Sequence, residues 1–240
     1  MKTGFIAITG ASSGIGETTA KKFMENGHNI LVIARRAHLL EQFTGDNVMK
    51  ASVDVTDREA LNKVLMEAED KFGPVEAIVN NAGRMLLGDI ATQNPIEWKE
   101  MYDVNVLGLL NGMQAVLPSM IERQTGTIIN VSSIAGKKTF ADHAAYVGTK
   151  FAVHSMSENV REEVSKYNVR VITIAPGVVE TELLSHTSDE QIKESYTEWK
   201  ESIHGGLNPN TVAETIYFVF NQPQYVNIRE VVLAPTKQQA

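Results

Sequence analysis

A tyrosine and a lysine four residues apart are the first side chains whose spacing could do chemistry. Tyr146 and Lys150 fall in a stretch of helical period, so both side chains lie on one face of the predicted helix. A phenol has an ordinary pKa of about 10, and a neighbouring ammonium group lowers it by favouring the ionised form. A tyrosine tuned in this way can donate a proton to a forming alkoxide or accept one from an alcohol. The pair alone is common on protein surfaces, so the catalytic interpretation depends on further residues.

A serine at the end of a predicted strand is the second candidate. Ser133 follows the predicted strand Thr127–Val131, and its hydroxyl can hydrogen-bond a substrate oxygen on which charge develops. The alternative is a hydroxyl that only satisfies a turn, which suits the neighbouring Ser132 better. We therefore predict that Ser133 stabilises the transition state.

A glycine-rich turn near the N-terminus is a candidate phosphate site. The first predicted strand, Phe5–Thr9, runs into Gly10-Ala11-Ser12-Ser13-Gly14-Ile15-Gly16 and then into a helix. Glycines let the backbone approach a pyrophosphate closely, and the N–H groups at a helix N-terminus stabilise its charge. The turn could be purely structural, but its place between the first strand and the first helix favours nucleotide binding.

Two further motifs complete a pattern that extends along most of the chain. Asn80-Asn81-Ala82-Gly83 follows the fourth predicted strand, and Tyr146-Val147-Gly148-Thr149-Lys150 opens a helix after Ser133. With the glycine turn, they resemble the short-chain dehydrogenase/reductase family. More narrowly, Ala144-Ala145-Tyr146 and the tail from Val226 to Thr236 resemble a bacterial branch. That branch includes NADP-dependent 3-hydroxy-acid (serine-type) dehydrogenases and NADPH-binding blue-fluorescent proteins.

The resemblance implies a role for each motif residue. Asn105 lies in a predicted helix, where asparagine is a poor helix former, and it would position a water that links Lys150 to solvent. Lys150 would also hold the nicotinamide ribose. The predicted catalytic residues are Asn105, Ser133, Tyr146 and Lys150. The predicted cofactor-binding residues are Gly10, Ser12, Ser13, Gly14, Ile15, Gly16, Arg35, Arg36, Asp54, Val55, Asn81, Ala82, Gly83, Tyr146, Lys150, Pro176, Gly177, Val179 and Thr181.

The end of the second predicted strand indicates which dinucleotide would bind. In this fold an acidic residue there binds the ribose 2′-hydroxyl of NAD, whereas an arginine accommodates the 2′-phosphate of NADP. The chain has Ala34 where NAD-specific family members place aspartate, followed by Arg35 and Arg36. Two cations at a helix start oppose the helix dipole, which favours a bound anion. Ser13 stands where many NADP-dependent relatives have a basic residue, so we predict a preference for NADP(H) and not absolute specificity.

Apolar runs rich in β-branched residues alternate with helical stretches, which predicts one doubly wound α/β Rossmann domain over residues 1–240. We expect a seven-stranded parallel sheet with helices on both faces. The segment of about residues 178–207 interrupts the alternation and is predicted to cover the ligand crevice. The predicted strands are Phe5–Thr9, Ile30–Ala34, Met49–Val53, Ala77–Asn80, Thr127–Val131, Arg170–Ala175 and Arg229–Leu233, and the helices are Ile15–Asn26, Arg58–Phe72, Pro95–Ile121, Tyr146–Lys166 and Thr211–Asn221.

Composition limits the partners of the chain. Its net charge of -7 argues against binding to nucleic acid or an anionic membrane, which needs clustered Lys and Arg. The absence of cysteine excludes disulfides and thiolate chemistry and suits a cytoplasmic protein. The N-terminal apolar run is too short for a signal peptide, and no run of 18 apolar residues occurs. His143 and His154 lack a second ligand at metal spacing, so we expect structural or substrate-lining roles and no metal.

The sequence thus predicts an NADP(H)-dependent oxidoreductase that moves hydride between the nicotinamide and a small substrate. The substrate could be a 3-hydroxy acid or an aldehyde or ketone, because the segment predicted to cover the crevice carries both apolar and polar side chains. These are Leu183, Leu184, His186, Tyr196, Trp199 and His204. An inactive NADPH-binding sensor and an epimerase on the same fold are the alternatives. The resemblance also implies a homotetramer or homodimer through Pro95–Ile121 and Tyr146–Lys166, and the apolar residues on more than one face of the first helix agree with this.

Overall fold

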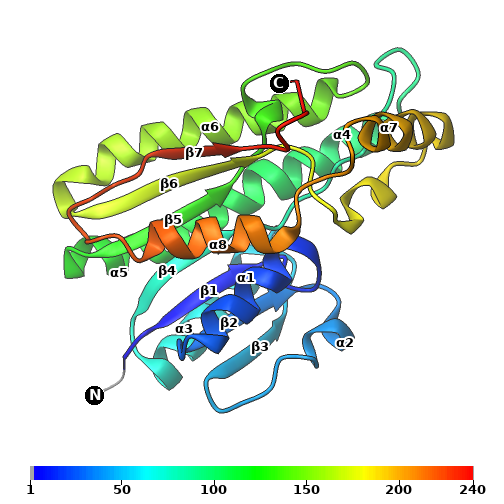
Figure 1. Cartoon of the computed structure of the whole chain (residues 1–240). Helices are drawn as coiled ribbons and strands as arrows, with labels where there is room; N and C mark the ends of the chain where they lie inside the picture. The colour runs from blue at the N-terminus through cyan, green and yellow to red at the C-terminus, as the bar shows by residue number, and fades with distance from the viewer. Residues whose placement is uncertain (1–2, 240) are drawn as a thin grey trace.

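The computed structural model describes residues 3–239 and contains one seven-stranded parallel sheet, as predicted (Figure 1). Met1, Lys2 and Ala240, which belong to the domain predicted for residues 1–240, lie outside the described residues. The strand order is β3-β2-β1-β4-β5-β6-β7, a doubly wound arrangement whose switch point lies between β1 and β4. The strands are β1 Phe5–Thr9, β2 Ile30–Ala34, β3 Val48–Ser52, β4 Val75–Asn80, β5 Gly126–Val131, β6 Val169–Pro176 and β7 Glu230–Leu233.

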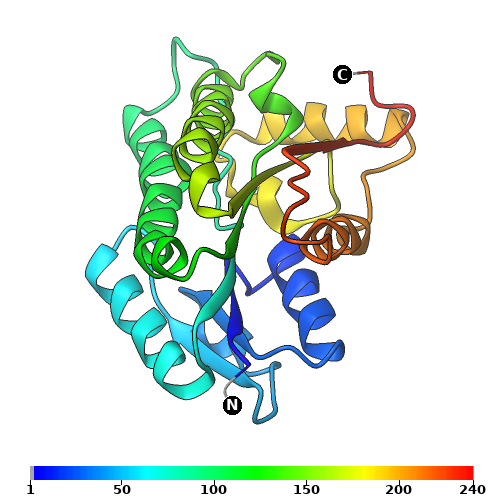
Figure 2. The ribbon, with the colours of Figure 1, turned by 90° about the vertical axis from the view of Figure 1, so that its left-hand side faces the viewer.

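The central strands are apolar on both faces because helices cover both faces of the sheet. All five residues of β1 are buried, with Phe5 and Ala7 in one core cluster and Ile6 and Ile8 in the other. The first cluster lies under α3 (Arg58–Phe72), α5 (Leu109–Arg123) and α6 (Ala144–Val164). The second lies under α1 (Gly14–Glu25) and α8 (Pro209–Phe220), as the view along the sheet in Figure 2 shows.

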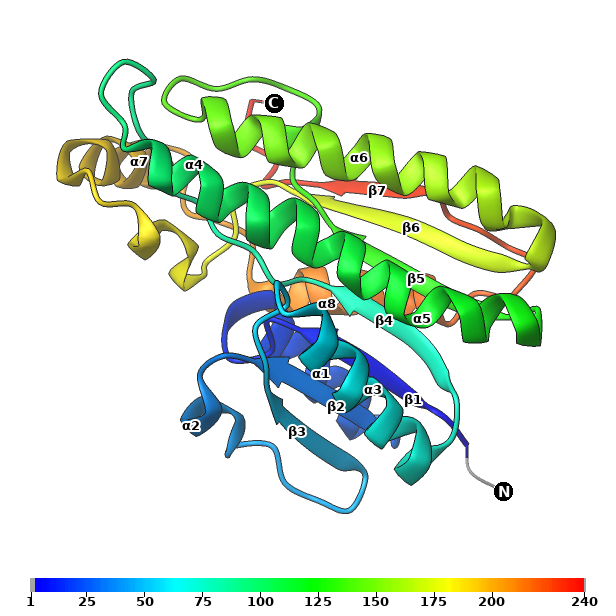
Figure 3. The same cartoon turned by 180° about the vertical axis from the view of Figure 1, so that it is seen from behind.

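The helix predicted over Pro95–Ile121 changes its hydrogen bonding midway. It consists of α4 (Pro95–Tyr102), a π-helical segment η1 (Asp103–Gly108) and α5, which follow one another in Figure 3. By length and composition alone, Pro95–Arg123 could cross a membrane. Its buried residues Leu109, Met113 and Val116 belong to the core cluster on the sheet, so this helix packs in the core of the fold.

The insertion after β6 folds into two short helical pieces. These are η4 (Glu182–His186) and α7 (Glu190–Ser202), and a parallel bridge between Val179 and Leu207 joins the two ends of the insertion. Figure 1 shows α7 beyond the carboxyl end of β6, next to the start of α4. The short helix α2 (Ala37–Leu40) and the 3-10 turn η2 (Ile134–Gly136) were not predicted.

Candidate active site

A cavity of about 580 Å³ opens at the carboxyl ends of the strands, where doubly wound sheets bind ligands. The predicted site residues all lie in the described part of the chain, and all but Gly16 and Asn105 line this cavity. The structure therefore brings together motifs that are far apart in the sequence, from Gly10 to Thr181.

The glycine turn needs glycine because of its backbone and its packing. Gly10 and Gly14 have φ angles of 66° and 56°, in the left-handed region. A Cβ on Gly16 would lie 2.3 Å from the Gly10 carbonyl oxygen, so Gly16 permits the close approach of the helix and does not face the cavity. Within residues 3–239, no side-chain hydrogen bond from Ser13 caps α1, which leaves N–H groups of its first turn available to an anion.

The Asn81 side chain holds the turn against the end of β4. Its Nδ2 donates to the carbonyl oxygens of Thr9 (3.0 Å) and Gly10 (3.3 Å). In return, the Thr9 hydroxyl accepts hydrogen bonds from the backbone N–H groups of Asn81 and Ala82. These contacts fix the position of the two loops between which a dinucleotide would lie.

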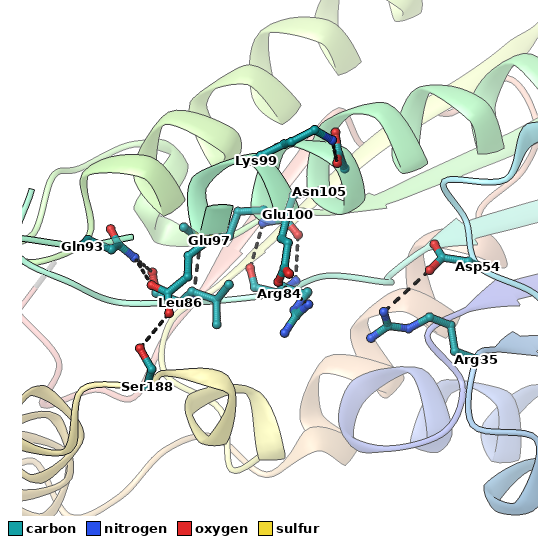
Figure 4. Close-up of polar contacts among 12 residues, drawn as sticks. Arg35, Asp54, Arg84, Leu86, Gln93, Glu97, Lys99, Glu100, Asn105 and Ser188 are labelled. Atoms are coloured by element: carbon teal, nitrogen blue, oxygen red, sulfur yellow. Dashed lines mark hydrogen bonds and ion pairs between the residues drawn. The ribbon is translucent and has the colours of Figure 1, made fainter. Parts of the chain in front are cut away.

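Two arginines follow β2 and reach the same cavity. The Arg36 guanidinium donates to the hydroxyls of Ser12 and Ser13 (3.0 and 2.8 Å) and pairs with Glu182 of η4 at 3.0 Å. The Arg35 guanidinium lies 3.6 Å from the Asp54 carboxylate (Figure 4). Burial raises the pKa of Asp54, but hydrogen bonds from Thr56 and the charge of Arg35 outweigh this, so that its pKa is lower than usual.

Tyr146 and Lys150 share a helix face, as predicted, but burial dominates their ionisation. Burial raises the pKa of Tyr146, and a hydrogen bond with Ser133 opposes this rise. The Lys150 ammonium donates to the Val131 carbonyl oxygen at 3.1 Å and lies 5.7 Å from the centre of the Tyr146 ring. Burial lowers the pKa of Lys150 to about 8. The expected lowering of the Tyr146 pKa is therefore wrong for this structure, because the desolvation of the buried phenol outweighs the interaction that favours its ionised form.

The two adjacent serines have different partners. The Ser132 hydroxyl donates to the Lys150 carbonyl oxygen (3.3 Å) and lies 2.9 Å from His154 Nδ1, so it is engaged inside the fold. The Ser133 oxygen accepts from the Ala135 backbone N–H at 3.1 Å, and its hydroxyl lies near enough to Tyr146 to oppose the rise in the pKa of the phenol. Ser133 is thus the serine that faces the tyrosine.

Asn105 lies in the π-helical segment, behind the cavity wall. Its amide Nδ2 donates to the Arg84 carbonyl oxygen (2.9 Å) and to the Thr149 hydroxyl (3.1 Å), while its Oδ1 accepts from the Arg84 N–H (2.8 Å). Figure 4 shows this pairing of Asn105 with the backbone of Arg84. The side chain thus connects the segment after β4 to α6, close to Lys150.

Apolar and aromatic groups surround Tyr146. Its core cluster contains Met85, Leu87 and Ala135, and Leu183 and Tyr196 of the insertion pack against it. Of the six side chains singled out in the covering segment 178–207, five line the cavity: Leu183, Leu184, His186, Tyr196 and Trp199. The sixth, His204, does not, and its Nε2 lies 2.9 Å from the Lys237 ammonium. Burial also lowers the pKa of His143, which lies beside the tyrosine ring. Arg84, Phe140 and Gln238 are among the lining residues that the sequence interpretation missed, and they belong to none of the quoted motifs.

The residues of the cavity fit a phosphorylated dinucleotide. Glycines in the left-handed region, the start of α1 and two arginines supply N–H donors for phosphate groups. Lys150 and Asn81 line the same cavity. Among residues 3–239, no group of three or more His, Asp or Glu side chains could hold a metal ion.

Fold and cavity together define a protein of the dinucleotide-binding Rossmann class. The chain belongs to the short chain dehydrogenase family, which residues 4–192 match. It is 36% identical to an uncharacterized oxidoreductase of Staphylococcus saprophyticus, over 99% of this chain and 98% of that protein. A closed form of serine dehydrogenase complexed with NADP+ superimposes with a TM-score of 0.91 and 32% identity, over 98% of this chain and 96% of that one. Serine dehydrogenase from Escherichia coli gives a TM-score of 0.84 and 30% identity, over 98% and 100% of the two chains.

Proposed function

We propose that this oxidoreductase uses NADP(H) to interconvert a small alcohol and the corresponding carbonyl compound. The observation that carries the proposal is that Ser133 and Tyr146 line, together with Lys150, the same cavity as the glycine turn. When bound, the nicotinamide supplies or accepts the hydride. The chain's own residues would hold the substrate oxygen and move its proton.

Tyr146 would be the proton donor during carbonyl reduction. Because burial keeps the pKa of Tyr146 high, the phenol is protonated at neutral pH and can donate to the oxygen of the forming alkoxide. Ser133 would donate a hydrogen bond to the same oxygen and so stabilise the developing charge. The positive charge of Lys150, held by the Val131 carbonyl behind the tyrosine, would favour the phenolate that remains.

Arg35 and Arg36 would bind the 2′-phosphate of NADP(H). Both line the cavity after β2, where Ala34 leaves no carboxylate to repel a phosphate. The planar guanidinium group of arginine matches phosphate geometry and stays charged at any physiological pH. The solved serine dehydrogenase complex with NADP+ supports this choice of cofactor.

The remaining predictions belong to the same proposal. Residues 178–207 would cover the bound substrate, and the chain would act in the cytoplasm on a small molecule, with neither nucleic acid nor membrane as a partner. Assembly into a homotetramer or homodimer would bury Tyr102, Leu107 and Phe151, which are 43%, 51% and 43% exposed on the predicted helix pair.

A substrate panel tests the proposal. Oxidation of NADPH would be followed with aldehydes, ketones and 3-oxo acids, and reduction of NADP+ with alcohols, serine and 3-hydroxy acids. We expect turnover of at least one pair in both directions. Tight NADPH binding without any turnover would favour a sensor, and stoichiometric NAD retained through purification would favour an epimerase.

A further inference from the structure

Two buried polar atoms in the cavity wall have no hydrogen-bond partner. Among residues 3–239, the buried side-chain atoms without a partner belong to Thr19, Asn80, Arg84, His186 and Asn227. Of these five residues, Arg84 and His186 line the cavity, and their atoms without a partner are Nε and Nδ1 respectively. A buried polar atom without a hydrogen-bond partner is costly, so two such atoms on residues that line one cavity point to a ligand that satisfies both.

Hydrogen bonds of Thr187 bring these two residues together from distant parts of the sequence. The Thr187 hydroxyl accepts from the Leu87 N–H at 3.1 Å and donates to the Met85 carbonyl oxygen at 3.4 Å. These bonds join the end of η4 to the segment after β4, next to His186 on one side and Arg84 on the other. In Figure 4 the Arg84 guanidinium points from its segment toward the yellow segment of the insertion.

The guanidinium of Arg84 presents a free edge. Its Nη1 pairs with Glu100 of α4 at 2.6 Å, which fixes the plane of the group and leaves the Nε side unpartnered. That side offers two parallel N–H groups, the arrangement that binds a carboxylate bidentately. Burial and the charge of Arg84 lower the pKa of His186, so a neutral imidazole can donate through Nδ1 beside it.

The other lysine and arginine side chains that line the described cavity also have partners. Lys150 donates to a carbonyl oxygen, and the remaining three pair with carboxylates: Arg35 with Asp54, Arg36 with Glu182 and Lys200 with Glu180. Arg84 differs from them in having a buried donor without a partner.

We propose that Arg84 and His186 form a subsite for the carboxylate of the substrate, so that the enzyme prefers hydroxy acids or oxo acids to uncharged alcohols and carbonyl compounds. This inference rests on the proposed function. The neighbouring residues Met85, Leu87 and Leu183 belong to or pack against the apolar cluster around Tyr146, which places the subsite on the substrate side of the cavity.

Matched pairs of substrates test the subsite. We would measure kcat/KM with NADP+ for 3-hydroxypropanoate and 3-hydroxybutanoate, and for 1,3-propanediol and 1,3-butanediol, in which a hydroxymethyl group replaces the carboxylate. Arg84→Met should lower the values for the acids by about 10- to 150-fold and those for the diols by about twofold or less. For Arg84→Lys, the kcat/KM values for the acids should lie between those of the wild type and of Arg84→Met, because lysine keeps the positive charge but lacks the two parallel N–H groups of the guanidinium.

Controls separate this subsite from general loss of charge or of fold. Lys99→Met removes a cation from neighbouring α4, where the side chain is 75% exposed and pairs with Asp103, and should leave all four values unchanged. His186→Phe should lower kcat/KM for the acids more than for the diols. Thermal unfolding would confirm that each variant is folded. Binding of 3-hydroxybutanoate, followed by tryptophan fluorescence because Trp199 lines the cavity, should weaken in Arg84→Met in parallel with kcat/KM.

Three outcomes would overturn the proposal. The first is a wild-type enzyme with higher kcat/KM for the diols than for the acids. The second is an Arg84→Met variant whose kcat/KM falls equally for acids and diols. The third is an Arg84→Met variant that loses only NADPH affinity, which would mean that Arg84 binds a phosphate of the cofactor and not the substrate carboxylate. If none of the four compounds, nor any other alcohol or carbonyl compound, were turned over, the proposed function itself would be contradicted.

Discussion

Replacing Arg36 with alanine should reduce the preference for NADP(H) over NAD(H). Arg36 Nη2 lies 3.0 and 2.8 Å from the hydroxyls of Ser12 and Ser13, so the guanidinium borders the glycine turn. A hydrogen bond between charged groups contributes about 1.5–3 kcal/mol, whereas the exposed pair of Arg36 with Glu182 contributes about 1 kcal/mol or less. The phosphate therefore displaces the carboxylate at small cost, and the NADPH-to-NADH ratio of kcat/KM should fall about 10- to 100-fold.

The assay compares kcat/KM for NADPH and NADH in the wild type, Arg36→Ala and Arg35→Ala with one saturating carbonyl substrate. Ala34→Asp combined with Arg35→Ala should shift the preference toward NAD(H), because the new carboxylate binds a ribose hydroxyl and repels a phosphate. An unchanged ratio in both single variants, or a wild-type enzyme that uses NADH at least as well as NADPH, would refute the reasoning.

Three further predictions concern stability and assembly. Asp57→Ala should lower the free energy of unfolding in urea by about 1 kcal/mol, because the Asp57 carboxylate accepts from the Ala60 N–H at the start of α3; an unchanged midpoint would count against this cap. Lys150→Met should be more stable than the wild type at pH 7, and its advantage should shrink between pH 8 and about pH 10.5. The unfolded chain holds the Lys150 proton up to its ordinary pKa of 10.5, whereas the folded chain releases it at a pKa of about 8. The stability of the wild type therefore rises with pH between these two values. A stability difference between variant and wild type that stayed constant over this pH range would contradict the prediction. Sedimentation should show a tetramer or dimer that Phe151→Asp dissociates, and a stable wild-type monomer at micromolar concentration would rule out the proposed assembly.

The sequence predicted the strands and the cavity motifs because both have local signals. β2 and the core of β5 are continuous apolar or β-branched runs, and the glycine turn directly follows β1, so the topology follows from alternation with helices. Boundaries shifted by one or two residues where turns set them. β4, for example, begins at Val75, directly after the Gly73-Pro74 turn.

Features that depend on contacts between distant residues could not be predicted. The contact of Thr187 with Met85 spans 102 residues, so nothing local placed His186 beside Arg84. The π-helical hydrogen bonding around Asn105 has no pattern in the residue types, although such segments occur often at functional sites. The spacing of Tyr146 and Lys150 predicted a shared helix face, but the direction of the pKa shift depends on burial, which the whole fold determines.

The most direct test of the account is the turnover of Tyr146→Phe. This substitution removes only the hydroxyl, from a ring that is 5% exposed, so the fold and the NADPH dissociation constant should be retained. Turnover of the best substrate should fall by about 10²–10⁴-fold, the contribution typical of general acid/base transfer. A Tyr146→Phe enzyme that binds NADPH normally and keeps most of its activity would contradict the account.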